Sequence, residues 1–339
     1  SSETIMVKYI IKRLLLAILI LFGVSLIIYF LLRLMPTNVI ADNYRISHSN
    51  GGASEEEIER GLQALLAAYG LEDNSFFGII RGYFLWLGRF LQGDMGESFK
   101  YGASVQDVIG QYMWLSFGIS FAALILEMII AIPLGIKCAV NQYGKLDYIA
   151  TILCVVGIAF PSFFLGNLFI KWFAVDLGWF ETGGLSSGIS PDAGIAYVID
   201  ILWHLVLPMS VMIILSIGGL MRYTRTNTLE VLNADYIRTA RAKGLSEGKV
   251  IYKHVFRNTM IPLVTQLSFT LPSLFGGAMI TEQIFALPGI GNQAYQGLLA
   301  GDIFLAMGYN MFLAVLTVIG VLFADLMYAV VDPRVKLGG

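Results

Sequence analysis

IIKRLLLAILILFGVSLIIYFLLRL, the sequence of Ile10–Leu34, decides the class of fold that this chain can adopt. At 1.5 Å per residue, a helix of this length exceeds the roughly 30 Å hydrocarbon core of a bilayer. A secretory signal has an apolar core of about 7–15 residues and then a small-residue cleavage site. The residues MPTN at 35–38 offer no such site. We therefore expect a retained transmembrane helix.

The composition of the whole chain agrees with a membrane protein. Of its 339 residues 57% are hydrophobic and 14% charged, and the mean hydropathy is +0.73. Soluble domains carry about 25% charged residues, so an ordinary soluble fold is excluded. The net charge of −2 leaves no basic face for nucleic acid. Cys138 and Cys154 lie in or beside apolar runs and indicate no disulfide framework.

Six apolar runs are long enough to cross the membrane, which predicts an all-α polytopic protein. The positive-inside rule then places both termini in the cytoplasm. The loops 176–200 and 285–302 contain no Lys or Arg and are expected outside, whereas 222–261 holds eight basic residues and is expected inside. The six predicted spans are 10–34, 112–136, 148–175, 201–221, 261–284 and 303–331.

This topology divides the chain into consecutive parts. Residues 1–5 precede Met6 and are interpreted as an expression remnant. The other expected parts are the first transmembrane helix at 6–35, an extracytoplasmic helical loop at 36–111, a five-helix core at 112–331 that includes the cytoplasmic loop 222–261, and a cytoplasmic tail at 332–339.

The outer loop is predicted to contain two amphipathic helices. Ser54 and Glu57 form a capping-box pattern before an apolar helical face that ends at Gly70. A second helix is predicted for 76–91, before the GDMG sequence at 93–96. These helices either cap the membrane domain or form a docking platform for an extracytoplasmic partner, and the sequence does not choose between the two.

The sequence contains none of the motifs of an enzyme. It has no GxxxxGK[ST] phosphate-binding loop, so we do not expect the chain to bind or hydrolyse ATP alone. Neither motif nor spacing indicates Ser-His-Asp or paired-carboxylate catalysis, so we expect no catalytic residue. Its three histidines have no Cys or carboxylate neighbours at metal-ligand spacing, which predicts no metal site. Glu127 lies in the middle of the second predicted span, where it either lines a pathway or bonds to a neighbouring helix.

The inner segment 222–261 is too long for a tight connection between spans, and its pattern predicts an ordered helix. Tyr236, Ile237 and Ala240 are expected to share one face, and Gly244 to end the helix. A partner inside the cell is the implied role. The alternative is a solvated basic loop that touches anionic lipid headgroups.

The segments DYIRTARAKGLS at 235–246 and HVFRNTMIP at 254–262 resemble the EAA loop of ABC importer permeases, and more narrowly the dipeptide, oligopeptide and nickel branch. The resemblance covers nearly the whole chain after Met6 and is to the first of the two permeases in such systems. Further matching stretches are 6–36, GDMGES at 93–98, IPLG at 132–135, FPSF at 160–163, EQIF at 282–285, PGIG at 288–291 and DPR at 332–334.

The chain departs from the general pattern in several places. Arg238 and Thr239 replace an acidic residue and an alanine, so that Ala240 alone matches there, and Pro262 lies farther from Gly244 than the pattern places it. The sequence PTNV at 36–39 stands where members often have PGDP. Residues 42–53 look like an insertion, so receptor contacts cannot be transferred to them.

The resemblance implies a type I importer permease of a prokaryotic inner or plasma membrane, forming half of a peptide pathway. Its implied partners are a homologous permease, membrane lipid, an extracytoplasmic binding protein, and two ATPases that bind ATP and magnesium. The implied ATPase-coupling residues are Tyr236, Arg238, Thr239, Ala240, Arg241, Lys243, Gly244 and Leu245. Nickel or glutathione is an alternative cargo. A secondary transporter, a channel and a membrane-embedded enzyme are the alternative classes.

The missing phosphate-binding loop gives a first test. The purified chain should release no phosphate from ATP in the presence of magnesium, because no backbone cradle for the phosphates is present. Phosphate release by the chain and by the assembled complex should be compared at equal concentration. Magnesium-dependent turnover in a preparation free of ATPase subunits would contradict the non-catalytic assignment.

Overall fold

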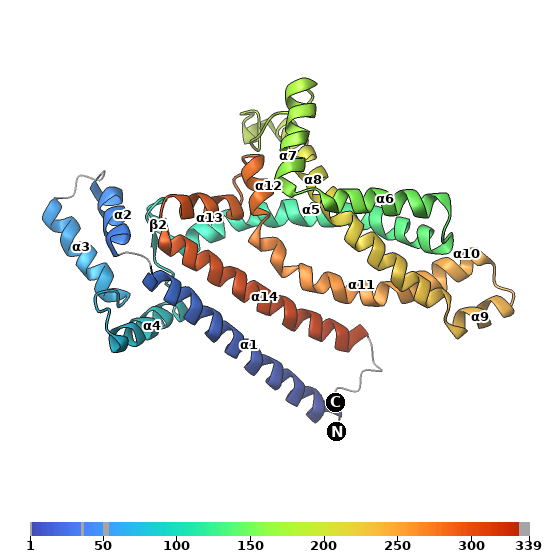
Figure 1. The fold of residues 1–339 in the computed structure, drawn as a ribbon, viewed down its shortest axis with the longest axis horizontal. Coiled ribbons are helices and arrows are strands. Elements are labelled where there is room, and N and C mark those ends of the chain that lie inside the picture. Colours follow the sequence, from blue (N-terminus) through green and yellow to red (C-terminus); the bar gives the residue numbers. More distant parts are fainter. Residues whose placement is uncertain (1, 35–36, 50–53, 332–339) are drawn as a thin grey trace. The chain divides into compact units, whose positions relative to one another are not determined.

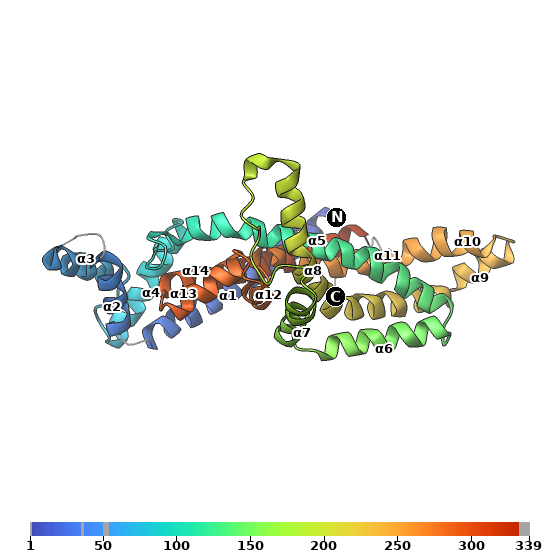
Figure 2. The ribbon, with the colours of Figure 1, turned by 90° about the horizontal axis from the view of Figure 1, so that it is seen from above.

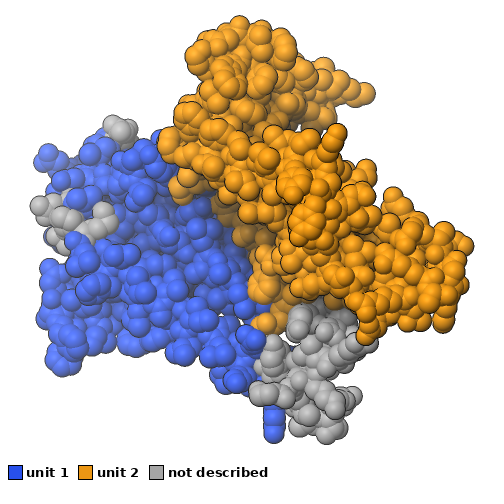
Figure 3. All heavy atoms as spheres, turned by 45° about the vertical axis from the view of Figure 1, so that its right-hand side comes forward, with its two compact units in different colours: residues 1–114, 289–322, 337–339 blue, residues 115–288, 323–336 orange. Residues whose placement is uncertain are grey.

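The computed structural model describes residues 2–34, 37–49 and 54–331 (Figure 1). The predicted tail 332–339 and the DPR stretch lie outside these ranges. The described chain forms two compact units, coloured separately in Figure 3. Unit 1 takes in the residues up to 114 together with 289–322, and unit 2 takes in 115–288 and 323–331. Each unit is described separately below.

Unit 1 is built from helices around the first predicted span. The capping box is confirmed, because the Glu57 N–H donates to Ser54 Oγ over 3.3 Å and the Ser54 N–H donates to Glu57 Oε2 over 2.9 Å. Gly70 adopts φ of +62°, as the predicted stop requires. The helices are α1 Ser2–Leu34, α2 Thr37–Ser49, α3 Glu55–Ala68, α4 Phe76–Leu91, the start of α5 Val105–Val140, α13 Ile290–Leu299 and most of α14 Ile303–Val331.

Three elements of unit 1 were not predicted. Helix α2 takes up the part of the apparent insertion that is described, residues 42–49, whereas 50–53 lie outside the described ranges. Helix α13 occupies the loop expected at 285–302. Strands β1 Glu97–Ser98 and β2 Ala103–Ser104 form an antiparallel hairpin, a small exception to the all-α prediction. The two-residue strands are too short for periodicity to distinguish them from a loop.

Unit 2 contains the remaining predicted spans. The end of α14 also belongs to it. Its elements are the rest of α5, α6 Lys145–Ala159, α7 Ser162–Phe169, the π-helix η1 Ile170–Asp176, the 3₁₀ turn η2 Pro191–Ala193, α8 Ile195–Leu232, α9 Asp235–Ala242, α10 Glu247–Lys249, the π-helix η3 Val250–Val255, α11 Phe256–Thr270, the 3₁₀ turn η4 Pro272–Gly276 and α12 Met279–Ile284.

The third predicted span, 148–175, is not one straight helix. Five helices of the described chain are long and apolar enough to cross a membrane, and a sixth candidate is the pair Lys145–Ala159 and Ser162–Asp176, bent by 100°. Phe160 is extended, with φ of −79° and ψ of 131°. The ring of Pro161 disfavours a helical residue before it, which explains the break.

Helix breaks in unit 2 are stabilised by a buried carboxylate. Glu282 on α12 is 2% exposed. Its Oε1 accepts a hydrogen bond from the Ser116 hydroxyl over 2.6 Å and another from the Ala278 N–H over 3.2 Å. The second bond satisfies a backbone donor at the start of α12, just after Gly277 with φ of +79°. Glu282 therefore makes a structural contact between α5 and this break.

Helices α6 and α8 pack closely because glycines face the partner helix. A Cβ added at Gly157 would lie 2.9 Å from the Ile214 carbonyl oxygen, and one at Gly218 would lie 2.9 Å from Cys154 Cβ. The buried Asp147 carboxylate joins the same helices, because Arg225 Nε and Nη2 donate to it over 2.7 and 2.8 Å. Small residues at such contacts are typical of membrane helix pairs.

The Asp147–Arg225 pair yields a stability prediction. Asp147→Asn leaves the Arg225 charge without its bidentate partner, and breaking a buried pair costs about 3 kcal/mol. The variant should expose the buried thiols Cys138 and Cys154 at a lower temperature, measured with a thiol-reactive fluorophore in detergent. Asp235→Asn is the matched control, since that carboxylate is 97% exposed and its loss should change stability by less than about 0.5 kcal/mol. If the thiols of both variants become reactive at the same midpoint temperature, the pair has no structural role.

Candidate functional site

The connection between α8 and α11 forms a helical hairpin, which we define as residues 233–255 and call the α9–η3 hairpin. It consists of α9, a turn at Gly244, α10 and the π-helix η3. Figure 2 shows α9 and α10 beyond the ends of α8 and α11. The predicted inner loop 222–261 is therefore shorter than expected, because its first eleven residues continue α8 and its last six belong to α11.

A small apolar core holds the hairpin together. Residues from α9 and η3 meet the last turn of α8 there, and this explains why a segment rich in charge is ordered. The fully or nearly fully buried members of the core are Ile237, Ala240, Val250 and Val255, with Val231 and Leu232 of α8 packed against them. At its base the Thr259 hydroxyl donates to Thr228 Oγ1 over 3.4 Å.

The turn at the tip is set by one glycine and one ion pair. Gly244 has φ of +77°, a conformation that costs an L-residue about 1 kcal/mol or more. No atom lies within 4 Å of a Cβ added there, so the strain of a substitution would come from the backbone alone. Across the turn, Arg241 Nε donates to Glu247 Oε1 over 2.8 Å.

Seven of the eight predicted coupling residues are exposed on the hairpin. They are Tyr236, Arg238, Thr239, Arg241, Lys243, Gly244 and Leu245. Ala240 is buried in the hairpin core instead. The prediction that Tyr236 shares a face with Ile237 and Ala240 is wrong, since Tyr236 is 49% exposed and Ile237 is fully buried. Neighbouring residues are separated by about 100° around a helix, so the buried face runs through Ile237 and Ala240, the third and sixth positions of the motif.

The exposed surface of the hairpin is basic. Arg238, Lys243, Lys249 and Lys253 are exposed there, against the exposed carboxylates of Asp235 and Glu247. Both carboxylates are within ion-pair distance of an arginine, Asp235 of Arg238 at 3.7 Å and Glu247 of Arg241. The two lysines of η3 and α10 therefore add to a net positive surface that suits an acidic partner.

Glu127 lies on α5 in unit 2, and 9% of its surface is exposed. Its carboxyl lies beside the Ser216 side chain of α8, whose hydroxyl donates to the Met212 carbonyl oxygen over 2.9 Å. Ser216 is itself on the exposed surface of α8. Glu127 therefore lies between α5 and α8, next to a serine that another subunit or a pathway can reach.

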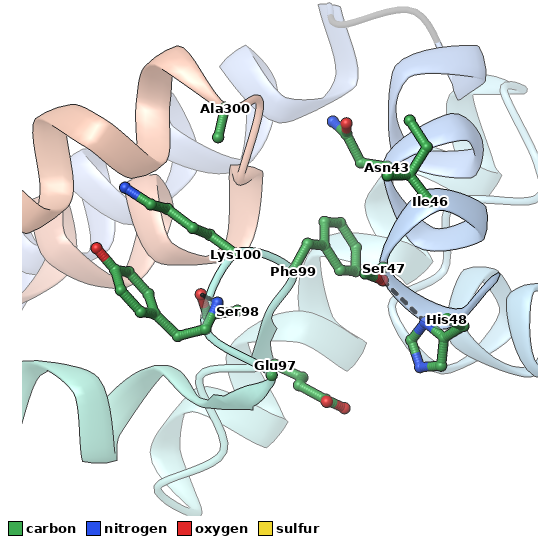
Figure 4. A pocket seen from close by; sticks show the side chains of 11 residues that line it. Asn43, Ile46, Ser47, His48, Glu97, Ser98, Phe99, Lys100 and Ala300 are labelled. Carbon is green, nitrogen blue, oxygen red and sulfur yellow. Dashed lines mark hydrogen bonds between the residues drawn. The ribbon is translucent and has the colours of Figure 1, made fainter. Parts of the chain in front are cut away.

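Unit 1 contains a polar pocket of about 470 Å³ between α2, the β1–β2 hairpin and Ala300 (Figure 4). Ser47 and His48 lie on one side of it, and Glu97 and Lys100 lie on the β-hairpin. Burial lowers the pKa of Lys100 and raises that of the neighbouring Tyr101 to about 12. The sequence analysis missed this pocket because α2 was not predicted.

Buried Asp302 anchors the β-hairpin beside this pocket. Its Oδ2 accepts hydrogen bonds from the Ser98 hydroxyl over 2.5 Å and from the Lys100 N–H over 3.1 Å. Its Oδ1 accepts one from the Leu305 N–H over 3.1 Å, which caps α14. Among the described residues, no group of three or more His, Cys, Asp and Glu could hold a metal ion.

Comparison with known proteins identifies the family. Residues 131–337 match the family described as "Binding-protein-dependent transport system inner membrane component". The chain is 36% identical to the oligopeptide transport system permease protein AppB of Bacillus subtilis, over 98% of this chain and 100% of AppB. It is 34% identical to the dipeptide transport system permease protein DppB of B. subtilis, over 84% and 86% of the two chains.

A third relative and a solved structure agree with this match. The oligopeptide transport system permease protein OppB of Haemophilus influenzae is 30% identical over 98% of this chain and 100% of OppB. The inward-facing MetNI methionine ABC transporter has a chain of similar fold, with a TM-score of 0.50 and 17% identity over 67% of this chain and 97% of that one. The fold is thus that of an importer permease, and the chain belongs to the family of binding-protein-dependent transport system inner membrane components.

Proposed function

We propose that this multi-pass membrane protein forms one half of the translocation pathway of an ATP-driven peptide importer. The observation that carries the proposal is the α9–η3 hairpin. It has an apolar core of its own, and basic side chains are exposed on its surface. The family match and the names of the relatives support the transport role. The other half of the pathway would be a homologous permease.

The hairpin would be the contact with a cytoplasmic ATPase. An element that transmits force must keep its shape under load. The α9–η3 hairpin can do so because it is stabilised by its own core, formed by Ile237, Ala240, Val250 and Val255. Closure of two partner ATPases, which would bind ATP and magnesium, would move this hairpin and the one on the second permease. Alternating access would follow from rigid-body movement of the attached helices.

An extracytoplasmic binding protein would deliver the cargo on the opposite side of the membrane. Both termini would then lie in the cytoplasm, as the distribution of Lys and Arg indicates. We place the docking surface for this protein on α2, α3 and the β1–β2 hairpin, because the polar pocket of unit 1 lies between α2 and that hairpin. Di- or oligopeptides are the proposed cargo. Mass spectrometry of ligand retained by the co-purified binding protein would distinguish them from nickel and glutathione.

The hairpin assignment is tested with charge and backbone variants. Lys243→Glu should leave the hairpin folded, because the side chain is exposed, and should weaken ATPase association about tenfold, which corresponds to roughly 1.4 kcal/mol. Gly244→Val should lower peptide-stimulated ATP hydrolysis through strain at φ of +77°. Both quantities are measured on the whole complex in proteoliposomes, with subunit stoichiometry determined by gel.

Two further variants serve as controls. Arg60→Glu makes the same charge change on α3, where the arginine pairs with Glu56, and should leave ATPase association unchanged. Ala240→Asp places a charge in the hairpin core and should disrupt the hairpin itself, detected by increased proteolysis near residue 244. If the Lys243→Glu and Gly244→Val complexes bind the ATPase and hydrolyse ATP in response to peptide as the parent complex does, the hairpin does not transmit the movement of the ATPase. Peptide uptake that persists without ATP would favour a secondary transporter or a channel.

Glu127 is proposed to line the pathway beside Ser216. Glu127→Gln keeps a polar side chain of nearly the same size beside Ser216 and removes the negative charge, whereas Glu127→Leu removes both the polar group and the charge. We expect the Gln variant to assemble like the parent and to show altered peptide uptake, since a pathway carboxylate acts on cargo through its charge. A Gln variant with parental uptake and a Leu variant with reduced assembly would assign Glu127 to helix packing instead.

A further inference from the structure

Helix α4 packs against a part of α1 that lies inside the membrane. Between Arg13 and Arg33, α1 carries 19 uncharged residues, which cover about 28 Å and match the hydrocarbon core of a bilayer. Ser25 lies eight residues before Arg33, or about 12 Å from it along the helix axis. The Ser25 and Tyr83 hydroxyls are hydrogen-bonded over 2.7 Å in a buried contact, so α4 reaches this depth through Tyr83.

The backbone of α4 also lies close to α1. A Cβ added at Gly82 would collide with the Tyr29 hydroxyl oxygen and would lie 2.6 Å from the Gly70 carbonyl oxygen, so the absence of a side chain permits this approach. The Tyr29 and Trp86 rings lie 5.8 Å apart, and the Phe22 and Tyr83 rings are in edge contact at the same distance. Tyr29 is four residues, or about 6 Å, inside the position of Arg33. The helix axis of α4 is therefore held below the level of that charge.

The start of α4 is fixed at the level of Arg33. Arg33 Nη2 donates to the Asp73 carbonyl oxygen over 2.6 Å, and Nη1 donates to Asn74 Oδ1 over 3.3 Å. Ser75 then caps the helix, accepting a hydrogen bond from the Gly78 N–H over 3.1 Å. The polar residues before α4 thus share the level of a charged group, and the helix continues from there along the apolar part of α1.

The face of α4 that turns away from α1 is apolar. Its large side chains are strongly exposed in the chain, from 41% to 80%. At 3.6 residues per turn they fall within about 100° of each other, and no charged residue lies inside this arc. They are Phe76, Phe77, Ile80, Phe84 and Leu91. A soluble loop rarely exposes such a face to water.

We propose that α4 is a membrane-embedded helix whose apolar face contacts lipid acyl chains, and that it is not part of an aqueous extracytoplasmic loop. Continuity with the lipid-facing surface of α1 identifies lipid as the occupant, since Leu19 and Ile27 of α1 are 64% and 62% exposed. Arg81 is exposed on α4 and is long enough to extend its guanidinium to the headgroups. The segments on either side of α4, including α2, α3 and the β1–β2 hairpin, would remain in water.

Spin labels measure the depth of this face in the assembled importer in lipid nanodiscs. Phe77→Cys and Phe84→Cys are labelled in a background carrying Cys138→Ala and Cys154→Ala. Collisions with oxygen, which concentrates in lipid, should exceed collisions with a water-soluble nickel chelate at both sites. The ratio of oxygen collisions to nickel-chelate collisions should resemble the ratio at Leu19→Cys on α1. It should exceed the ratio at Glu56→Cys on α3, where the native carboxylate is 85% exposed.

Two outcomes would overturn the proposal. A nickel-dominated signal at residues 77 and 84 would place α4 in water, and protection from both reagents would show that a protein subunit covers it. A second readout is independent of labelling. Phe84→Glu should reduce the yield of folded protein in membranes, whereas Phe84→Leu, which keeps the same position apolar, provides the matched comparison and should give the parental yield. An equal yield for Phe84→Glu and the parent would contradict burial in lipid.

Discussion

The constraint on which this structure depends is that water cannot satisfy backbone N–H and C=O groups inside a bilayer. Most of the described chain meets it with continuous helices such as α5 and α8. At two helix starts that follow a break, a buried carboxylate supplies the missing partner. Glu282 accepts from the Ala278 N–H after the break at Gly277, and Asp302 accepts from the Leu305 N–H at the start of α14. These acidic residues are therefore structural.

The same principle separates two kinds of charge in unit 2. Asp147 is buried and makes a bidentate pair with Arg225, so its role is to hold α6 against α8. The charges of the α9–η3 hairpin are exposed, and a separate apolar core carries the stability of that hairpin. Exposed charges on an independently stabilised element can be used for a partner at little cost to the fold. This separation makes the hairpin suitable for docking.

Unit 1 illustrates how burial can be misjudged from connectivity. The long segment between the first two spans counts as an outer loop by its position in the sequence. Its helix α4 nevertheless shares aromatic and hydroxyl contacts with the apolar part of α1 through Tyr83 and Trp86. A run of 16 residues is too short to be recognised as a span, so a hydropathy argument passes over it.

Periodic and local signals were sufficient for much of the molecule. Hydropathy predicted the membrane class, and the Ser54 capping box and Gly244 were identified correctly because caps and left-handed turns depend on adjacent residues. The buried position of Ala240 and the pocket beside Asp302 depend on contacts between separate segments of the chain. Periodicity assigns a residue to a helix face, but what covers that face is decided by packing between distant segments.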